Sequence, residues 1–295
     1  MRWAEGFIAV DWGTTNRRGY LIGSDGSLEQ EMEDDQGILS VPPEGFPSAV
    51  AELRARLGDR PLLMAGMIGS NRGWVEARYV PTPAGLDDLA HQLTWAEPGF
   101  AAIIPGVSHS TPDRADVMRG EEVQILGAVA TGMVSDHAMV CHPGTHNKWA
   151  SVIGGRIASF RTVMTGELFN LLKEHSILAD LLSHPAVADS SFELGVEHGL
   201  AHDDLTSELF AIRARTLLGR APAEQAASYT SGLLIGNDLR IGLRAAPVGE
   251  IIVMGRPELT RLFAVALKVA GREAREIDGE EAFLAGVRAL AELIP

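Results

Sequence analysis

The sequence has only one cysteine, Cys141, among its 295 residues, so it cannot form an intrachain disulfide or a cysteine-rich metal site. Such scarcity is typical of proteins from reducing compartments, and we expect a cytoplasmic location. Residues 1–10 show no secretory signal pattern, and no apolar stretch approaches the roughly 18 residues of a membrane span. No membrane partner is therefore expected.

Basic residues are also scarce. The chain has 25 lysines and arginines against 39 aspartates and glutamates, which gives a formal net charge of −14. Because this charge repels phosphate backbones, nucleic acid is not an expected partner. A small anion can bind only where a local group of basic side chains, or a helix N-terminus, overrides that background.

The chain does have a 46% hydrophobic content and enough length for two domains. Short apolar runs predict strands at residues 7–10, 18–22, 61–65, 101–105, 138–141 and 251–254. Apolar spacing of three and four residues predicts helices at 46–57, 121–131, 167–175, 204–218, 258–270 and 280–293. This mixture indicates an α/β protein.

The two halves of the chain share a motif. Moving position 11 onto position 142, a shift of 131, places Asp11–Asn16 on His142–Asn147, each inside a strand-turn-strand pattern. In this register the coinciding pairs are Gly13 and Gly144, Thr14 and Thr145, Asn16 and Asn147, Ile22 and Ile153, and Gly23 and Gly154. We therefore predict two domains related by duplication, residues 1–134 and 135–295, with a cleft between them.

Each shared turn is suited to binding phosphate. Glycine lets the backbone approach an anion closely, and backbone N–H groups and hydroxyls can then donate to it. The predicted phosphate-binding residues are Gly13, Thr14 and Thr15 in the first turn and Gly144, Thr145 and His146 in the second. Asp11 precedes the first turn and is the predicted Mg²⁺ ligand, directly or through water, although an Asx-turn is the alternative. Its counterpart, His142, is a poor ligand for a hard cation, so only the first half should carry the metal.

Longer stretches resemble one family within the actin-like ATPase and sugar kinase superfamily, the 2-dehydro-3-deoxygalactonokinases. They read VDWGTTNRRGYLI at 10–22, MAGMIGSNRGW at 64–74, DVMRGEEVQILGA at 116–128, CHPGTHNKWASV at 141–152 and FRTVMTGELFNLL at 160–172. The resemblance implies two actin-like (ribonuclease H-like) domains of mixed sheet plus helices. It also implies a transferase of carbohydrate metabolism that passes the γ-phosphate of ATP, with Mg²⁺, to a hydroxyl of 2-dehydro-3-deoxy-galactonate in galactonate degradation. Gly255 resembles part of the superfamily's adenosine motif.

The reaction needs a carboxylate near the attacking hydroxyl. The candidates are Asp116, Glu121 and Glu122, which lie where a helix should begin, so each can instead be a partner of the helix dipole. Asp116 is slightly preferred, because residues before the Gly120 turn can project into a cleft. The role of His142 stays open, because an acidic residue often stands at that position in the superfamily.

Binding a sugar acid needs a cation for its carboxylate and polar groups for its hydroxyls. The predicted substrate-binding residues are Arg17, Arg18, Ser70, Asn71, Arg72, Arg119 and Lys148. Trp74 is either a wall of the sugar site or a core residue. Gly232 and Gly236 either admit adenine beside a helix or let two helices pack, and packing is preferred.

Three other functions remain open. A kinase of a neutral or amino sugar would share the fold, an exopolyphosphatase-like enzyme would hydrolyse phosphoanhydrides, and a non-catalytic actin-like protein would only bind ATP or polymerise. The sequence leaves the oligomeric state, the preferred stereoisomer and the phosphorylated hydroxyl undetermined.

Overall fold

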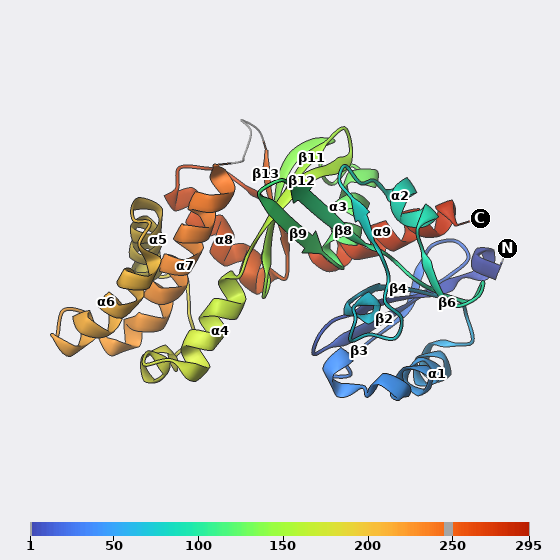
Figure 1. Ribbon diagram of the computed structural model, residues 1–295, viewed down its shortest axis with the longest axis horizontal. Helices are drawn as coiled ribbons and strands as arrows, with labels where there is room; N and C mark the ends of the chain where they lie inside the picture. Colours follow the sequence, from blue (N-terminus) through green and yellow to red (C-terminus); the bar gives the residue numbers. More distant parts are fainter. Residues whose placement is uncertain (1, 245–249, 295) are drawn as a thin grey trace. The chain divides into compact units, whose positions relative to one another are not determined.

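The computed structural model describes residues 2–244 and 250–294 (Figure 1). The chain forms two compact units, the first built from Met1–Asp136, Ile153–Ser159 and Glu280–Pro295, the second from His137–Val152 and Phe160–Gly279. The predicted boundary at 134/135 lies close to the first break. Residues 153–159 and 280–294, predicted to belong to the second domain, are instead part of the first unit.

The first unit contains a six-stranded mixed sheet in the order β3-β2-β1-β4-β7-β6. Strands β1, β2 and β3 are antiparallel neighbours, whereas β4 runs parallel to β1 and β7 runs parallel to β4. The strands are β1 (Phe7–Trp12), β2 (Arg17–Ile22), β3 (Leu28–Asp34), β4 (Leu62–Gly66), β6 (Thr94–Glu97) and β7 (Ala101–Ile103). Helix α1 (Phe46–Leu57) buries Phe46, Val50 and Leu53 in a core that also holds Trp12. Apolar spacing along α1 thus places one helix face against the sheet.

A second, three-stranded sheet in the order β5-β8-β9 belongs to the same unit. It consists of β5 (Tyr79–Pro81), β8 (Gly106–Thr111) and β9 (Arg114–Met118). β8 and β9 are antiparallel, with Met118 buried at the end of β9. The sequence analysis did not identify this sheet, because its strands are short and mostly exposed.

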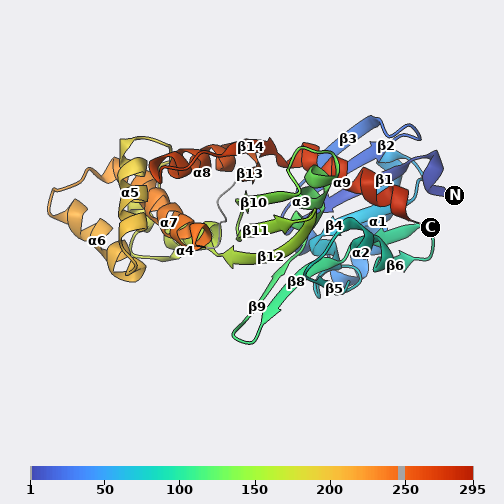
Figure 2. The same cartoon turned by 90° about the horizontal axis from the view of Figure 1, so that it is seen from above.

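Three more helices complete the first unit: α2 (Leu86–His91), α3 (Glu121–Ala130) and α9 (Gly279–Leu293). α3 lies beside α9 in both ribbon views (Figures 1 and 2). A Cβ atom added to Gly127 would lie 2.3 Å from the backbone nitrogen of Gly286, and one added to Gly286 would lie 2.2 Å from the carbonyl oxygen of Val123. This close backbone contact explains why the C-terminal helix belongs to the first unit, and no local sequence pattern reveals it.

The second unit repeats the central strand order of the first. Its five-stranded sheet has the order β12-β11-β10-β13-β14, and β10, β13 and β14 run parallel. The strands are β10 (His137–His142), β11 (Asn147–Ile153), β12 (Arg156–Val163), β13 (Ile251–Gly255) and β14 (Arg275–Asp278), of which the last residue of β11 and the first residues of β12 are counted with the first unit. β10, β11 and β12 thus correspond to β1, β2 and β3, and β13 corresponds to β4. This correspondence supports the predicted duplication.

The described residues of the second unit form the α-helices α4 (Thr165–His175), α5 (Ser190–Ala201), α6 (Leu205–Leu217), α7 (Ala226–Leu243) and α8 (Pro257–Val269). α5 packs closely on α7. Cβ atoms added to Gly232 and Gly236 would lie 2.0 Å and 2.3 Å from the carbonyl oxygens of Phe192 and Val196. The packing interpretation of these glycines is therefore confirmed.

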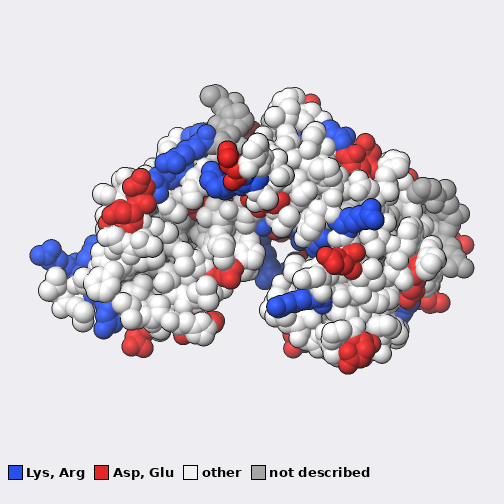
Figure 3. Space-filling model, viewed as in Figure 1, with Lys and Arg blue, Asp and Glu red and all other residues white. Residues whose placement is uncertain are grey.

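No helix within the described residues is long and apolar enough to cross a membrane. On the face drawn in Figure 3, basic side chains occur in small groups interspersed with acidic ones.

Candidate active site

The first Gly-Thr turn connects β1 to β2 and is held in shape by backbone hydrogen bonds. The N–H of Gly13 donates to the carbonyl of Asn16 at 2.9 Å, which closes the turn. The N–H groups of residues 37–39 donate to the carbonyls of Thr15, Gly13 and Thr14, at 3.1, 3.0 and 3.2 Å respectively. Thr14 and Thr15 are exposed. The turn is thus rigid while both hydroxyl-bearing residues face solvent.

Asp11 lies at the carboxyl end of β1, next to two glycines with positive φ. A Cβ atom added to Gly66 (φ 88°) would lie 2.8 Å from the carbonyl oxygen of Trp12 and 3.4 Å from Oδ1 of Asp11. A Cβ atom added to Gly120 (φ 112°) would lie 3.4 Å from the Cα of Gly66. Gly66, at the end of β4, therefore lies beside Asp11, and Gly120, just before α3, lies beside Gly66; the positive φ of each position favours glycine.

Asp11 fits the role of a magnesium ligand. Mg²⁺ commonly keeps several waters and is held by one or two carboxylates together with substrate phosphates. Within the described part of the chain, no group of three or more His, Cys, Asp and Glu side chains is arranged to hold a metal by itself. A single partly exposed carboxylate beside a phosphate turn fits such a shared site.

Glu122, a predicted catalytic base, is completely buried. Both of its carboxylate oxygens accept a hydrogen bond from the N–H of Gly120, at 2.8 Å each. Burial, together with the nearby charge of Glu121, raises the pKa of Glu122 to about 8. The prediction is therefore corrected: Glu122 caps the turn that begins α3 and is closed to a substrate in this structure.

The other two candidate carboxylates differ in position. Glu121, partly exposed in the first turn of α3, accepts the N–H of Arg119 at 3.0 Å. Asp116 lies in β9 opposite His109, and its Oδ1 accepts the N–H of Val117 at 2.9 Å. Gly120 lies next to Gly66, which in turn lies next to Asp11. Glu121 directly follows Gly120 in the chain, so it is the nearer of the two candidates to this contact. Either carboxylate remains a candidate base.

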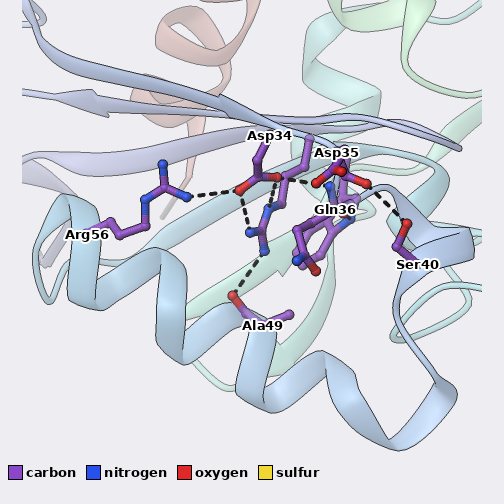
Figure 4. A network of polar contacts seen from close by, with 8 residues as sticks. Asp34, Asp35, Gln36, Ser40, Ala49 and Arg56 are labelled. Atoms are coloured by element: carbon purple, nitrogen blue, oxygen red, sulfur yellow. Dashed lines mark hydrogen bonds and ion pairs between the residues drawn. The ribbon is translucent and has the colours of Figure 1, made fainter.

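Arg17, predicted to bind substrate, is a core residue of the first unit. Only 1% of the residue is exposed, and its guanidinium donates to both oxygens of Asp34, at 3.2 and 2.8 Å, and to the carbonyl of Ala49, at 3.1 Å. Asp34 also accepts a hydrogen bond from Nη1 of Arg56, at 3.0 Å (Figure 4). The prediction for Arg17 is therefore corrected, because β2 directs this side chain into the sheet–α1 interface.

Arg18 points to the opposite face of β2 and is paired in register with Asp11 on β1. Its Nε lies 3.2 Å from Glu33, and 20% of its side chain is exposed. Its Nη1 also lies 3.9 Å from Glu280, so Arg18 is paired with two carboxylates in this structure, and its role in substrate binding stays a prediction.

The loop after β4 carries Ser70, Asn71 and Arg72. Ser70 is buried and its Oγ accepts the N–H of Arg72 at 3.3 Å, whereas Asn71 and Arg72 are exposed. Trp74 is partly buried and packs against the hydrophobic core, and its role as a wall of the sugar site stays a prediction. The loop therefore exposes Asn71 and Arg72 to solvent, while Ser70 is held by burial and by its hydrogen bond.

Arg119 lies between this loop and β5. Its Nη2 donates to the carbonyl of Ala77 at 2.7 Å, and its guanidinium lies 4.4 Å from the ring centre of Tyr79. Its Nε and Nη1 atoms are buried without a hydrogen-bond partner among the residues that the structure describes. Its donor capacity is thus only partly used, unlike that of Arg17.

The second Gly-Thr turn joins β10 to β11 and is supported by α4. A Cβ atom added to Gly166 would lie 2.4 Å from the carbonyl oxygen of Gly144, and the N–H of Glu167 donates to the carbonyl of Thr145 at 2.9 Å. The ring of His146 is 2.5 Å from the Glu167 carboxylate. The turn therefore rests on the first turn of α4, whose N-terminal N–H groups favour nearby anions.

Gly255, a predicted nucleotide-site residue, ends β13 beside this turn. Its φ is 150°, and an added Cβ atom would lie 3.5 Å from the carbonyl oxygen of Pro143. The shift of 131 places Pro143 on Trp12, and β13 corresponds to β4. Gly255 therefore occupies the same position relative to the second turn as Gly66 does relative to the first.

Lys148 and His142, on either side of the second turn, are both buried, 4% and 9% exposed. The Nζ of Lys148 lies 3.4 Å from the carbonyl of His146. Sequence reasoning missed a further buried group, Asp238 on α7, which is fully buried and bonded to Asn147. The available signal was a lone carboxylate in an otherwise apolar and small-residue helix.

A cavity of about 310 Å³ opens beside the second turn, within the second unit. Its apolar walls come from α4, α7 and α8, and its polar edge comes from the turn itself. The lining includes Gly144, Thr145, Phe169, Leu234, Ile235 and Phe263. A flat apolar group carrying an anionic chain fits this combination of surfaces.

Comparison with solved structures defines the fold class. The activator of 2-hydroxyisocaproyl-CoA dehydratase from Clostridium difficile, with bound ADPNP, superposes with a TM-score of 0.52 at 10% identity, covering 98% of this chain and 95% of that one. At this identity the likeness concerns the fold alone. Together with the repeated strand order, it confirms an α/β protein of two actin-like, ribonuclease H-like domains.

Comparison with sequences defines the family. Residues 11–290 match the family described as 2-keto-3-deoxy-galactonokinase. The chain is 36% identical over 292 residues to the 2-dehydro-3-deoxygalactonokinase of Escherichia coli (strain K12), covering 98% of both. A crystal structure of a Sinorhizobium meliloti protein proposed to be a 2-dehydro-3-deoxygalactonokinase superposes with a TM-score of 0.91 at 34% identity, covering 98% of this chain and 99% of that one. The chain belongs to the 2-keto-3-deoxy-galactonokinase family, as the sequence motifs predicted.

Proposed function

We propose that this protein transfers the γ-phosphoryl group of ATP to a hydroxyl of 2-dehydro-3-deoxy-galactonate, in the cytoplasm. The observation that carries the proposal is the repeated turn: each unit holds a Gly-Thr turn beside a positive-φ glycine on the neighbouring parallel strand. Such paired turns suit a polyphosphate, and family membership supplies the sugar acid. A transferase of this kind needs no nucleic-acid or membrane partner.

The nucleotide is assigned to the turn and cavity of the second unit. Backbone N–H groups at Gly144 and Thr145 can donate to phosphate, while Leu234, Ile235 and Phe263 offer an apolar surface for the base. Mg²⁺, when bound at Asp11, would neutralise charge on the phosphates. Thr14 and Thr15 of the first turn are exposed, so their hydroxyls can also donate to phosphate.

The sugar acid is assigned to the first unit, near the loop after β4. Arg72 and Arg119 are the preferred partners of its carboxylate, because the first is exposed and the second has unused buried donors. Ser70 and Asn71 supply hydroxyl and amide groups for the sugar. Glu121 or Asp116 accepts the proton of the attacking hydroxyl.

The decisive test is a coupled ADP-release assay with Mg-ATP and a panel of acceptors. The panel holds 2-dehydro-3-deoxy-galactonate, other 2-dehydro-3-deoxy sugar acids, matched neutral and amino sugars, and a control without sugar. We expect turnover with 2-dehydro-3-deoxy-galactonate far above all other arms. Preferred turnover of a neutral sugar would instead support the alternative kinase, and ADP release without sugar would support a phosphoanhydride hydrolase.

A further inference from the structure

Asp238 is a buried carboxylate that receives hydrogen bonds from three side chains. Nδ2 of Asn147 donates to both of its oxygens, at 2.9 and 2.8 Å, and the indole Nε1 of Trp149 donates to Oδ1 at 2.7 Å. The hydroxyl of Thr165 donates to Oδ2. Asp238 is 0% exposed, and each of these three partners is a neutral donor. The carboxylate thus joins β11, α4 and α7 from one point.

Two of these partners, Asn147 and Thr165, lie at the end of the second turn and at the start of the helix that supports it. Asn147 directly follows His146, so it fixes the point where the chain leaves the turn. Thr165 begins α4, and the next residue, Gly166, packs against the carbonyl of Gly144. Asp238 therefore sets where the turn ends and where its supporting helix begins.

Asp238 also lies on the cavity-lining face of α7. Ile235, Leu234 and Ser231 precede it by three, four and seven residues, the spacing of one helix face, and all three line the cavity. Asp238 itself does not line the cavity. It therefore acts on a ligand there only through its neighbours.

A buried carboxylate of this kind is an expensive way to join helices. Replacing buried polar networks with apolar residues of similar volume is often neutral or stabilising. A requirement for exact placement explains its presence better than a gain in stability does. The groups that it places are the phosphate turn and the apolar wall assigned to the base.

We propose that Asp238 is a positioning residue of the nucleotide site, which fixes the distance between the second phosphate turn, α4 and the α7 wall of the cavity. The inference rests on the proposed function, because it takes a nucleotide as the ligand of this cavity. Loss of the carboxylate should weaken nucleotide binding and leave sugar-acid binding unchanged.

The test uses Asp238→Asn, which has nearly the same size but replaces one acceptor oxygen with a donor. We expect the Kd for Mg-ADP, measured by calorimetry, to rise about tenfold or more, since small misplacements of binding groups have large effects. The KM for 2-dehydro-3-deoxy-galactonate at saturating ATP should change less than about twofold. Thr230→Val is the matched control, because Thr230 is buried on the same helix and bonds only within it, to Ala226.

A second pair of variants decides the matter if Asp238→Asn does not fold. Because Thr165 also lines the cavity, Trp149→Phe, which removes the indole donor to Asp238 at a residue outside the cavity lining, is tested beside the two Thr165 variants and should also weaken Mg-ADP binding. Thr165→Val removes the hydroxyl that donates to Asp238, whereas Thr165→Ser retains it. We expect a weaker Mg-ADP affinity in the first and a nearly wild-type affinity in the second. An unchanged Kd in Thr165→Val, or equal losses in nucleotide and sugar-acid binding in Asp238→Asn, would overturn the inference.

The same titrations separate this inference from the proposed function. If the wild-type chain binds no Mg-ADP, the nucleotide assignment fails and the inference fails with it. If the wild type and Asp238→Asn bind Mg-ADP equally well, only the role of Asp238 is refuted.

Discussion

The two phosphate turns share one backbone design but differ in what surrounds it. The first follows β1, whose last two residues are Asp11 and Trp12, and is held by hydrogen bonds from the backbone of residues 37–39. The second follows a strand that ends in His142 and is supported by α4 and the buried Asp238 network. The comparison shows how a duplicated hairpin can specialise: the acidic copy suits a metal, and the copy beside an apolar cavity suits a nucleoside.

Each unit contains a buried carboxylate, and the two accept hydrogen bonds from different kinds of donor. Glu122 accepts hydrogen bonds from the backbone of Gly120, whereas Asp238 accepts them from side chains of three elements. Burial raises the pKa of Glu122 to about 8 and that of Asp238 to about 6. The first carboxylate thus shapes a local turn, and the second connects distant segments.

The largest expected effect comes from Asp11→Asn, which removes the acidic feature that distinguishes the first turn. We expect kcat/KM to fall by a factor on the order of 100 to 1,000, the range typical for losing one electrostatic contact to a transition state. The measurement is steady-state kinetics at several Mg²⁺ concentrations. Asp25→Asn, in the exposed turn between β2 and β3, is the control and should stay near wild type. Equal activity of both variants would remove Asp11 from the metal site.

The next largest effect is expected from alanine substitutions at Gly66 and Gly255, which occupy corresponding positions in the two units. Alanine at Gly66 would place Cβ 2.8 Å from a carbonyl oxygen, whereas alanine at Gly255 would have 3.5 Å. Both need positive φ, so both variants should lose stability, by about 1–3 kcal/mol for Gly66→Ala and less for Gly255→Ala. Urea unfolding measures the difference. The reverse order would contradict the tighter backbone contact at Gly66.

A smaller, pH-dependent effect separates the two buried carboxylates. The folded-state pKa values of Glu122, about 8, and Asp238, about 6, both lie above the ordinary values, so folding favours the protonated forms. Each contribution to stability is full at low pH and is lost as pH rises through the folded pKa. Between pH 6 and 8 the loss should therefore come mainly from Glu122, at up to about 1.4 kcal/mol per pH unit.

Glu122→Gln checks this expectation, because glutamine keeps an acceptor for Gly120 but does not ionise. Its unfolding free energy in urea should change less than that of the wild type between pH 6 and 8. Parallel pH curves for the two proteins would show that Glu122 does not titrate in this range.

Several features of the site could be predicted from the sequence because their signals are local. The turn residues Gly13 and Gly144, and Asp11 before the first turn, stand next to short apolar strands in a repeated pattern. Gly255 follows its own predicted strand in the same way. Strand–turn geometry of this kind depends on a few neighbouring residues.

Other assignments failed because they depend on contacts between distant residues. Arg17 and Arg18 are neighbours, yet β-strand alternation buries one with Asp34 and leaves the other beside Asp11. Glu122 stands at a predicted helix start, but only the folded first unit shows that it is completely buried. No sequence motif identifies Asp238, because its three hydrogen-bond partners lie 73 to 91 residues away in the chain.

The sequence by itself determined the family, the two Gly-Thr turns and the strand–turn–strand units that carry them, because these follow from local spacing and residue type. The tertiary structure alone decided which arginine is buried, which carboxylate is closed to substrate, that α9 joins the first unit and that Asp238 supports the second turn. These outcomes depend on burial and on long-range hydrogen bonds, which exist only after the elements have packed.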